Sequence, residues 1–349
     1  MRRVAKQGSA RTRAGWRLPK AALALVAVMV SGAHAAANEA RRGPDWSLVN
    51  PRADWPARDS QGEFVYKDQL WILGGWFDAK MPNPRDVWKS RDGKVWTRTV
   101  GVAPWEHSDL SVALIHRDRM WFMGGRKLPG KENSNKVWTS TDGAAWKLEG
   151  QAGWCPRVSA SFVVFKDRMW VLGGTEDFYD HSEAMVKNDV WSSADGTSWK
   201  LETPSAGWSK RAHAQAVVFD GKMWILGGGL WHPEHVAVND VWCSADGAHW
   251  TQITPAAAWK PRLWFSAVVY RGRLWVLGGW SKENGNFGDV WFSKDGKDWT
   301  ELKSNVIWKK RHEHSVVVFQ DKLWLYGGYA DALSSEVWTL QLPPDWPGN

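Results

Sequence analysis

Six side chains in this sequence could bind a ligand through aromatic stacking and a positive charge. They are Trp76, Trp231, Trp264, Trp280, Tyr329 and Arg126. Four of them occupy one recurring place, two residues after the first glycine of a Gly-Gly pair. Flat aromatic faces stack on sugar rings or hold a cation, so we predict a ligand-binding surface with carbohydrate as the expected ligand. The alternative is that these loop tryptophans pack on one another.

Four charged residues are candidates for catalysis on such a ligand. They are Glu313, Arg311, Glu176 and Arg211. General acid–base catalysis needs one positioned carboxylate, and an arginine can bind a carboxylate through two parallel hydrogen bonds. Arg211 and Arg311 also belong to a column of five arginines, each three residues after a tryptophan. Such recurrence is more typical of a residue that fastens a turn, so both interpretations stay open.

Four histidines are candidate metal ligands, namely His213, His232, His312 and His314. His312 and His314 alternate on an expected strand and therefore share one side of it. Two imidazoles on one side could bind a metal ion if a third ligand reached them. The alternative is that these histidines are structural. We therefore predict no cofactor, and metal binding stays an open alternative.

The elements that must position these residues follow from a repeat. Gly-Gly pairs begin at residues 74, 124, 173, 227, 278 and 327, and tryptophans lie 19 and three residues before each pair. A Val-Trp step follows each pair, and five of the six units continue with an Asp-Gly turn and a further tryptophan. Asp-Gly between two short apolar runs is a hairpin signal. Each unit therefore predicts four short strands, for example over residues 216–219, 223–226, 240–244 and 249–253.

The sixth unit lacks its own fourth strand, and residues 43–50 carry the missing pattern with Trp46 in the expected place. The period of about 50 residues, the apolar second strand ending in Gly-Gly and the aromatic residues on the third and fourth strands resemble the kelch repeat. The resemblance covers residues 43–342. It implies an all-β fold, a six-bladed β-propeller of four-stranded kelch-like blades. Residues 43–349 would form this single domain, and the N-terminal strand would close the last blade.

Kelch relatives offer several functions. The central domain of galactose oxidase is similar in repeat, but its copper site needs two tyrosines, two histidines and a Tyr–Cys crosslink, and this chain has only five tyrosines. The Asp-Gly turns look like the Asp-box of sialidases with one residue fewer, which implies fold alone. Secreted sialic acid mutarotases are similar in length and architecture. Our leading interpretation is a carbohydrate-binding module that uses loops on one face; the alternatives are a sugar-acting enzyme of the mutarotase type and a protein–protein interaction scaffold.

The N-terminus predicts export. Residues 1–35 combine a basic stretch, an apolar run over residues 21–30 and an Ala-His-Ala step, which is typical of a signal peptide. Residues 36–42 would be a short linker. The predicted location is therefore secreted or periplasmic, with no integral membrane span after cleavage, and a retained anchor is the alternative.

Charge and cysteine content limit the partners. Seven of the 45 basic residues and none of the 37 acidic ones lie in residues 1–35, so the rest of the chain is close to neutral. We therefore expect no nucleic-acid partner. The expected partner is a carbohydrate, a cell-envelope ligand or another protein. We expect the protein itself to be a monomer. Cys155 and Cys243 fall at different points of the repeat and are expected to be separate thiols.

Overall fold

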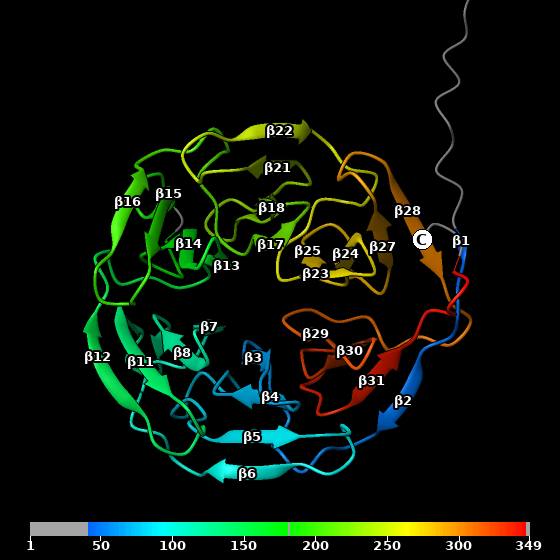
Figure 1. Ribbon diagram of the computed structural model, residues 1–349, viewed down its shortest axis with the longest axis horizontal. Coiled ribbons are helices and arrows are strands. Elements are labelled where there is room, and N and C mark those ends of the chain that lie inside the picture. Colours follow the sequence, from blue (N-terminus) through cyan, green and yellow to red (C-terminus); the bar gives the residue numbers. More distant parts are fainter. Residues whose placement is uncertain (1–40, 181, 347–349) are drawn as a thin grey trace, which may run out of the picture. The chain divides into compact units, whose positions relative to one another are not determined.

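Six blades, each with four antiparallel strands, stand around a common axis as in a propeller (Figure 1), and residues of their innermost strands line a central channel. The computed structural model describes residues 41–180 and 182–346, which contain strands and turns and no helix. The predicted all-β, six-bladed fold is confirmed.

From the innermost strand outward, blade 1 contains β3 (Gly62–Val65), β4 (Leu70–Leu73), β5 (Val87–Ser90) and β6 (Thr97–Val100), and blade 2 contains β7 (Val112–His116), β8 (Arg119–Met123), β11 (Lys136–Ser140) and β12 (Lys147–Gln151). Blade 3 contains β13 (Ser161–Phe165), β14 (Arg168–Thr175), β15 (Val186–Ser193) and β16 (Lys200–Thr203), and blade 4 contains β17 (Gln215–Phe219), β18 (Lys222–Leu226), β21 (Val241–Ser244) and β22 (Thr251–Thr254). Blade 5 contains β23 (Ser266–Tyr270), β24 (Arg273–Leu277), β27 (Val290–Ser293) and β28 (Trp299–Lys303), and blade 6 contains β29 (Ser315–Phe319), β30 (Lys322–Tyr326), β31 (Val337–Leu340) and β2 (Ser47–Asn50).

The N-terminal strand closes the ring, as predicted. β2 pairs antiparallel with β31, so one blade contains both ends of the domain. Trp46 packs edge-on against Trp308 with ring centroids 6.0 Å apart, and each of the other five blades contains an equivalent tryptophan pair at 5.9–6.0 Å. The last two residues of the expected linker form β1 (Arg41–Arg42), which pairs in parallel with β28. The expected signal peptide lies outside the described residues.

The second strand of each blade is buried on both sides because neighbouring blades pack against it. The tryptophan on this strand packs against the glycine of the Asp-Gly turn in the next blade. In blade 5, Gly296 lies against the ring of Trp224 from blade 4, and four other blades repeat this contact. Blade 6 has no such turn, and there Leu342 and Trp346 of the C-terminal segment join the buried cluster of Trp275. These contacts pack each blade against its neighbour around the ring.

The arginine column is structural throughout. Arg211 donates to both carboxylate oxygens of Asp240 at 2.7 and 2.9 Å and to the Gly227 carbonyl at 3.0 Å. Arg311 likewise donates to Glu336 and to the Gly327 carbonyl. Each arginine thus ties a blade-to-blade connection to the Gly-Gly pair and to the third strand of its own blade. Blade 2 has Ser108 at this position, which donates to the Pro84 carbonyl instead.

Three blades extend the loop between their second and third strands into a small hairpin. These hairpins are β9 (Arg126–Lys127) with β10 (Glu132–Asn133), β19 (Gly229–Leu230) with β20 (Val236–Ala237), and β25 (Trp280–Ser281) with β26 (Gly285–Asn286). They carry Arg126, Trp231 and Trp280, three of the six predicted ligand-binding residues. The loops that differ between blades therefore hold the residues that depart from the repeat.

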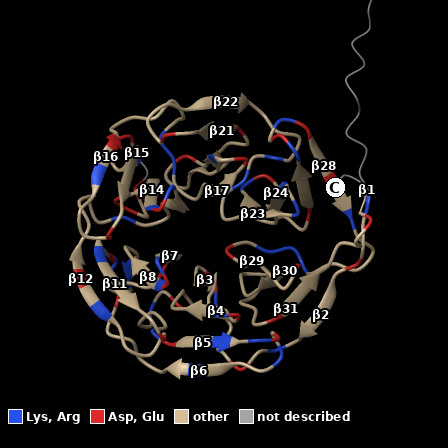
Figure 2. Ribbon diagram, viewed as in Figure 1, with Lys and Arg blue, Asp and Glu red and all other residues tan. Residues whose placement is uncertain are grey.

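The remaining sequence predictions concern charge, cysteines and membrane spans. Charged residues are spread over all six blades and do not gather on one of them (Figure 2). Cys155 and Cys243 are both free thiols, the first exposed and the second buried. Within the described part of the chain, no helix is long and apolar enough to cross a membrane.

Candidate functional site

A ring of six residues surrounds the channel at one position of the repeat, two residues after the arginine column. They are Ser60, Leu110, Ser159, His213, Trp264 and Glu313, and all six have a positive φ between 50° and 57°. Backbone hydrogen bonds join neighbours in this ring, from the Glu313 amide to the Trp264 carbonyl at 2.8 Å and from the Ser60 amide to the Glu313 carbonyl at 3.2 Å. Left-handed backbone is costly for residues other than glycine, and its recurrence in every blade shows that it belongs to the turn that enters the innermost strand. The sequence pattern gave no sign of this conformation.

The residue before each ring position bridges to the recurring place after the Gly-Gly pair. Asp59 forms such a bridge with Trp76, Asp109 with Arg126, Leu263 with Trp280 and His312 with Tyr329. The variable side chains of each blade are thereby brought to the same end of the channel. This is why residues far apart in the sequence meet in one site.

A cavity of about 340 Å³ opens at this end, and all six predicted ligand-binding residues line it. Asp59, Asp109, His312, Glu313 and Phe178 complete most of its wall. The structure thus brings together Trp76, Trp231, Trp264, Trp280, Tyr329 and Arg126.

The aromatic residues also contact one another. The ring centroid of Trp231 lies 4.6 Å from that of Trp264 and 5.4 Å from that of Trp280. His235, which sequence analysis did not single out, packs on Trp231 and Trp280 at 4.9 and 4.7 Å. The two expectations for these residues are therefore compatible, because the rings pack on one another and still present a surface to the cavity.

Three carboxyl groups from consecutive blades lie on the opposite side of the same cavity. Arg126 donates from Nε and Nη2 to one oxygen of Asp109, at 2.9 Å from Nε, and its guanidinium stacks on Phe178 at 4.1 Å. Burial, together with the nearby Glu313 and Asp109 charges, raises the pKa of Asp59 well above its usual range. Burial and the charge of Asp109 raise the pKa of Glu313 to about 8. One guanidinium therefore faces three acids.

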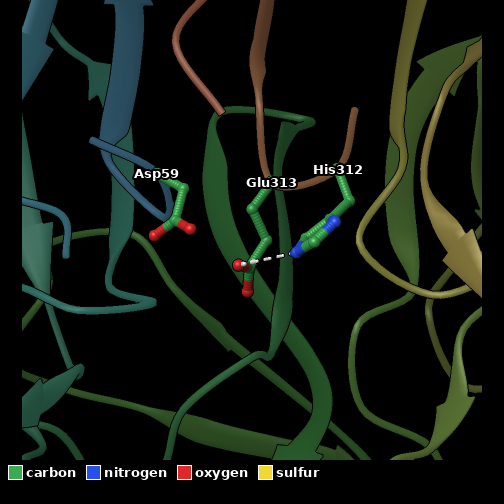
Figure 3. Close-up of side chains that lie close together, drawn as sticks. All are labelled: Asp59, His312 and Glu313. Carbon is green, nitrogen blue, oxygen red and sulfur yellow. Dashed lines mark ion pairs between the residues drawn. The ribbon is translucent and has the colours of Figure 1, made fainter. Parts of the chain in front are cut away.

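His312 also lines the cavity, and Figure 3 shows its ring beside Glu313. Its Nδ1 lies 2.6 Å from Oδ1 of Asn286, whose amide nitrogen donates to the Tyr329 carbonyl at 3.2 Å. Because the amide nitrogen of Asn286 is directed to Tyr329, its Oδ1 faces the imidazole and accepts a hydrogen bond from Nδ1. Nδ1 therefore carries the proton, and Nε2 carries the lone pair. Burial lowers the pKa of His312 to about 4, so the ring is neutral at physiological pH. Nε2 lies 3.8 Å from a carboxylate oxygen of Glu313.

Several other candidates lie elsewhere. Arg211 and Arg311 are fully buried in the contacts described above, and Glu176 pairs with Lys187 at 2.9 Å. His213 and His314 line a second, deeper cavity of about 120 Å³ in the channel, and His232 is exposed. Of the four candidate histidines, only His312 meets carboxylates in a group that could hold a metal ion, and this group is Asp59, His312 and Glu313 within the described residues.

Comparison with known families agrees with this architecture. A family model described as the KLHDC2/KLHL20/DRC7 Kelch-repeats domain matches residues 63–279, more than half of the chain. The protein is thus a kelch-type β-propeller, a class of binding and protein-interaction modules. It belongs to the kelch-repeat family. No curated protein matches the chain.

Proposed function

We propose that this protein binds a carbohydrate in the aromatic cavity. The observation that carries the proposal is the cavity itself, in which Trp76, Trp231, Trp264, Trp280 and Tyr329 offer ring faces beside polar groups. Its volume of about 340 Å³ lies at the lower end of the range typical of small-ligand sites. Aromatic faces contact the apolar side of a sugar ring, and carboxylates and a guanidinium bind its hydroxyl groups.

The rigid scaffold supports this proposal. Trp264 and Glu313 are held at their ring positions by the backbone hydrogen bonds between blades, and Trp280 is held by its bridge to Leu263. A site that is already formed loses little conformational entropy when it binds. We further propose, on the strength of the N-terminal signal pattern, that the protein acts outside the cytoplasm and that its ligand is an extracellular or cell-envelope saccharide.

The test is a binding titration of the purified protein against neutral, acidic and amino sugars and cell-wall oligosaccharides, followed by calorimetry. Trp280→Ala should abolish saccharide binding while leaving the thermal stability nearly unchanged, because the ring is only half-buried in a loop hairpin. Trp275→Ala is the matched control. Its ring is fully buried, so this change should cost about 3–5 kcal/mol of stability.

Two results would overturn the proposal. Failure of every saccharide class to bind would show that the cavity has another ligand, such as a protein side chain. Saccharide binding that persists unchanged in both Trp280→Ala and Trp76→Ala would place the sugar site elsewhere on the protein.

A further inference from the structure

Asp59, His312 and Glu313 form a group of three potential ligands in the wall of the cavity. One ligand atom from each lies within 4.8 Å of the other two. Asp59 precedes the innermost strand of blade 1, and the other two precede that of blade 6, so adjacent blades supply the group. Figure 3 shows Glu313 between Asp59 and His312.

The backbone holds these residues in place. The amides of Asp59 and His312 donate to the carbonyls of Trp76 and Tyr329 at 3.1 and 3.2 Å. Glu313 occupies a ring position, and its amide donates to Trp264. The three ligands therefore need only side-chain adjustment to converge on one point.

An unsatisfied buried atom points to a missing partner in this group. Asp59 is only 3% exposed, and its Oδ1 has no hydrogen-bond partner among the described residues. A buried acceptor without a partner destabilises the folded state, because it has lost its hydrogen bonds to water. His312 adds a second acceptor, because the hydrogen bond at Nδ1 directs the Nε2 lone pair toward Glu313.

The charges of the site point in the same direction. Arg126 is the single guanidinium on the cavity wall, so if Asp59, Asp109 and Glu313 all gave up their protons, two negative charges would be uncompensated. A divalent cation would balance them. A buried cluster composed of acceptors and excess negative charge is suited to a cation.

We propose that Asp59, His312 and Glu313 bind a divalent transition-metal ion of the Zn²⁺ or Mn²⁺ class, through one oxygen of each carboxylate and Nε2 of the imidazole. The mixture of one nitrogen and two oxygen ligands favours such ions over Ca²⁺ and Mg²⁺, which prefer oxygen alone. Asn286 orients the imidazole in the way that outer contacts orient histidine ligands in metal sites. Three protein ligands leave further coordination positions for water or a ligand in the cavity.

Calorimetric titration of the full chain with ZnCl₂ and MnCl₂, after treatment with EDTA and removal of the chelator, tests this proposal. One ion should bind per chain. The near-isosteric changes Asp59→Asn, His312→Gln and Glu313→Gln should each weaken binding at least tenfold. His249→Gln is the matched control, because His249 is an exposed histidine beside Asp246 on an outer turn, and it should change nothing.

Electron paramagnetic resonance of the Cu²⁺-loaded wild-type protein gives a readout that does not depend on how the variants fold. The spectrum should show coupling to a single imidazole nitrogen. Coupling to none or to several, unchanged affinity in His312→Gln, or loss of binding in His249→Gln would overturn the proposal and indicate binding to the exposed surface only. The proposal does not depend on carbohydrate binding, since the metal alone is the probe.

Discussion

The contact between each Asp-Gly turn and the tryptophan of the preceding blade makes a quantitative prediction at Gly296. This glycine has φ of +74°, and a Cβ added to it would lie 2.3 Å from Cζ3 of Trp224. The ring cannot retreat easily, because it is buried and its Nε1 donates to the Phe219 carbonyl at 2.8 Å. Gly272 provides the control, since it has φ of +64° and open space around the added atom.

Gly296→Ala and Gly272→Ala share the cost of left-handed backbone, about 1–2 kcal/mol. Overpacking against the ring adds about 1–3 kcal/mol to Gly296→Ala alone. The expected losses in the free energy of unfolding are therefore roughly 2–5 kcal/mol for Gly296→Ala and 1–2 kcal/mol for Gly272→Ala. Urea denaturation followed by tryptophan fluorescence and circular dichroism measures both values. Equal losses would refute the idea that close approach to Trp224 is what requires glycine in this turn.

Three further substitutions test the ring closure, the acidic group and the arginine column. Trp46→Ala should cost about 3–5 kcal/mol because the residue is 2% exposed and its ring packs on Trp308. Leu48→Ala, two residues later and 45% exposed, should stay within about 0.5 kcal/mol, and similar losses for the two variants in urea denaturation would contradict the closure. In EDTA-treated protein, the folded state keeps the Glu313 proton up to a pKa of about 8 while the unfolded state releases it near 4.5, so stability falls as pH rises between these values. Glu313→Gln has no such proton to lose, so its stability relative to the wild type should rise across that window. Parallel curves of melting temperature against pH for the two proteins would show that Glu313 is ionised throughout. Arg262→Ala should cost about 3–5 kcal/mol in the same urea assay, because it leaves the partly buried carboxylate of Asp289 without its charged partner. A loss below about 1 kcal/mol would mean that the arginine column contributes little to stability.

The fold could be predicted from sequence because the scaffold residues recur with fixed spacing. A tryptophan at the same distance from every Gly-Gly pair leaves no room for insertions, and the Asp-Gly turns mark the outer hairpins. The same counting identified Trp46 as the missing member of blade 6. It could not show that Trp346 packs beside Trp275 in place of a turn, because the C-terminal segment has no counterpart in the repeat.

The site could be predicted only in part. Trp76, Trp264 and Trp280 can be singled out because they lie outside the recurring tryptophan positions of the repeat, and they do meet in one cavity. Asp59 was missed because an aspartate after an arginine carries no signal of its own. The available signal was positional, since Asp59 and His312 occupy the same place in two blades that become neighbours once the ring closes. Its buried, partnerless oxygen depends on packing that no spacing rule describes.

The division between fixed and variable positions explains how one scaffold can carry a specific site. In every blade the arginine of the column, or Ser108 in blade 2, fastens the connection between neighbouring blades through its hydrogen bonds. The next two residues lie at the end of the channel where the cavity opens. The first set ties the blade connections to the sheets, and members of the second set line the cavity. In this chain these two positions place carboxyl groups on blades 6, 1 and 2 and Trp264 on blade 5, and the loops after the Gly-Gly pairs add tryptophans on blades 1, 4 and 5. A ligand that spans the cavity would therefore meet the indole rings of blades 4 and 5 on one side and the carboxyl groups of blades 6, 1 and 2 on the other, which is the arrangement that the proposed saccharide and cation sites need.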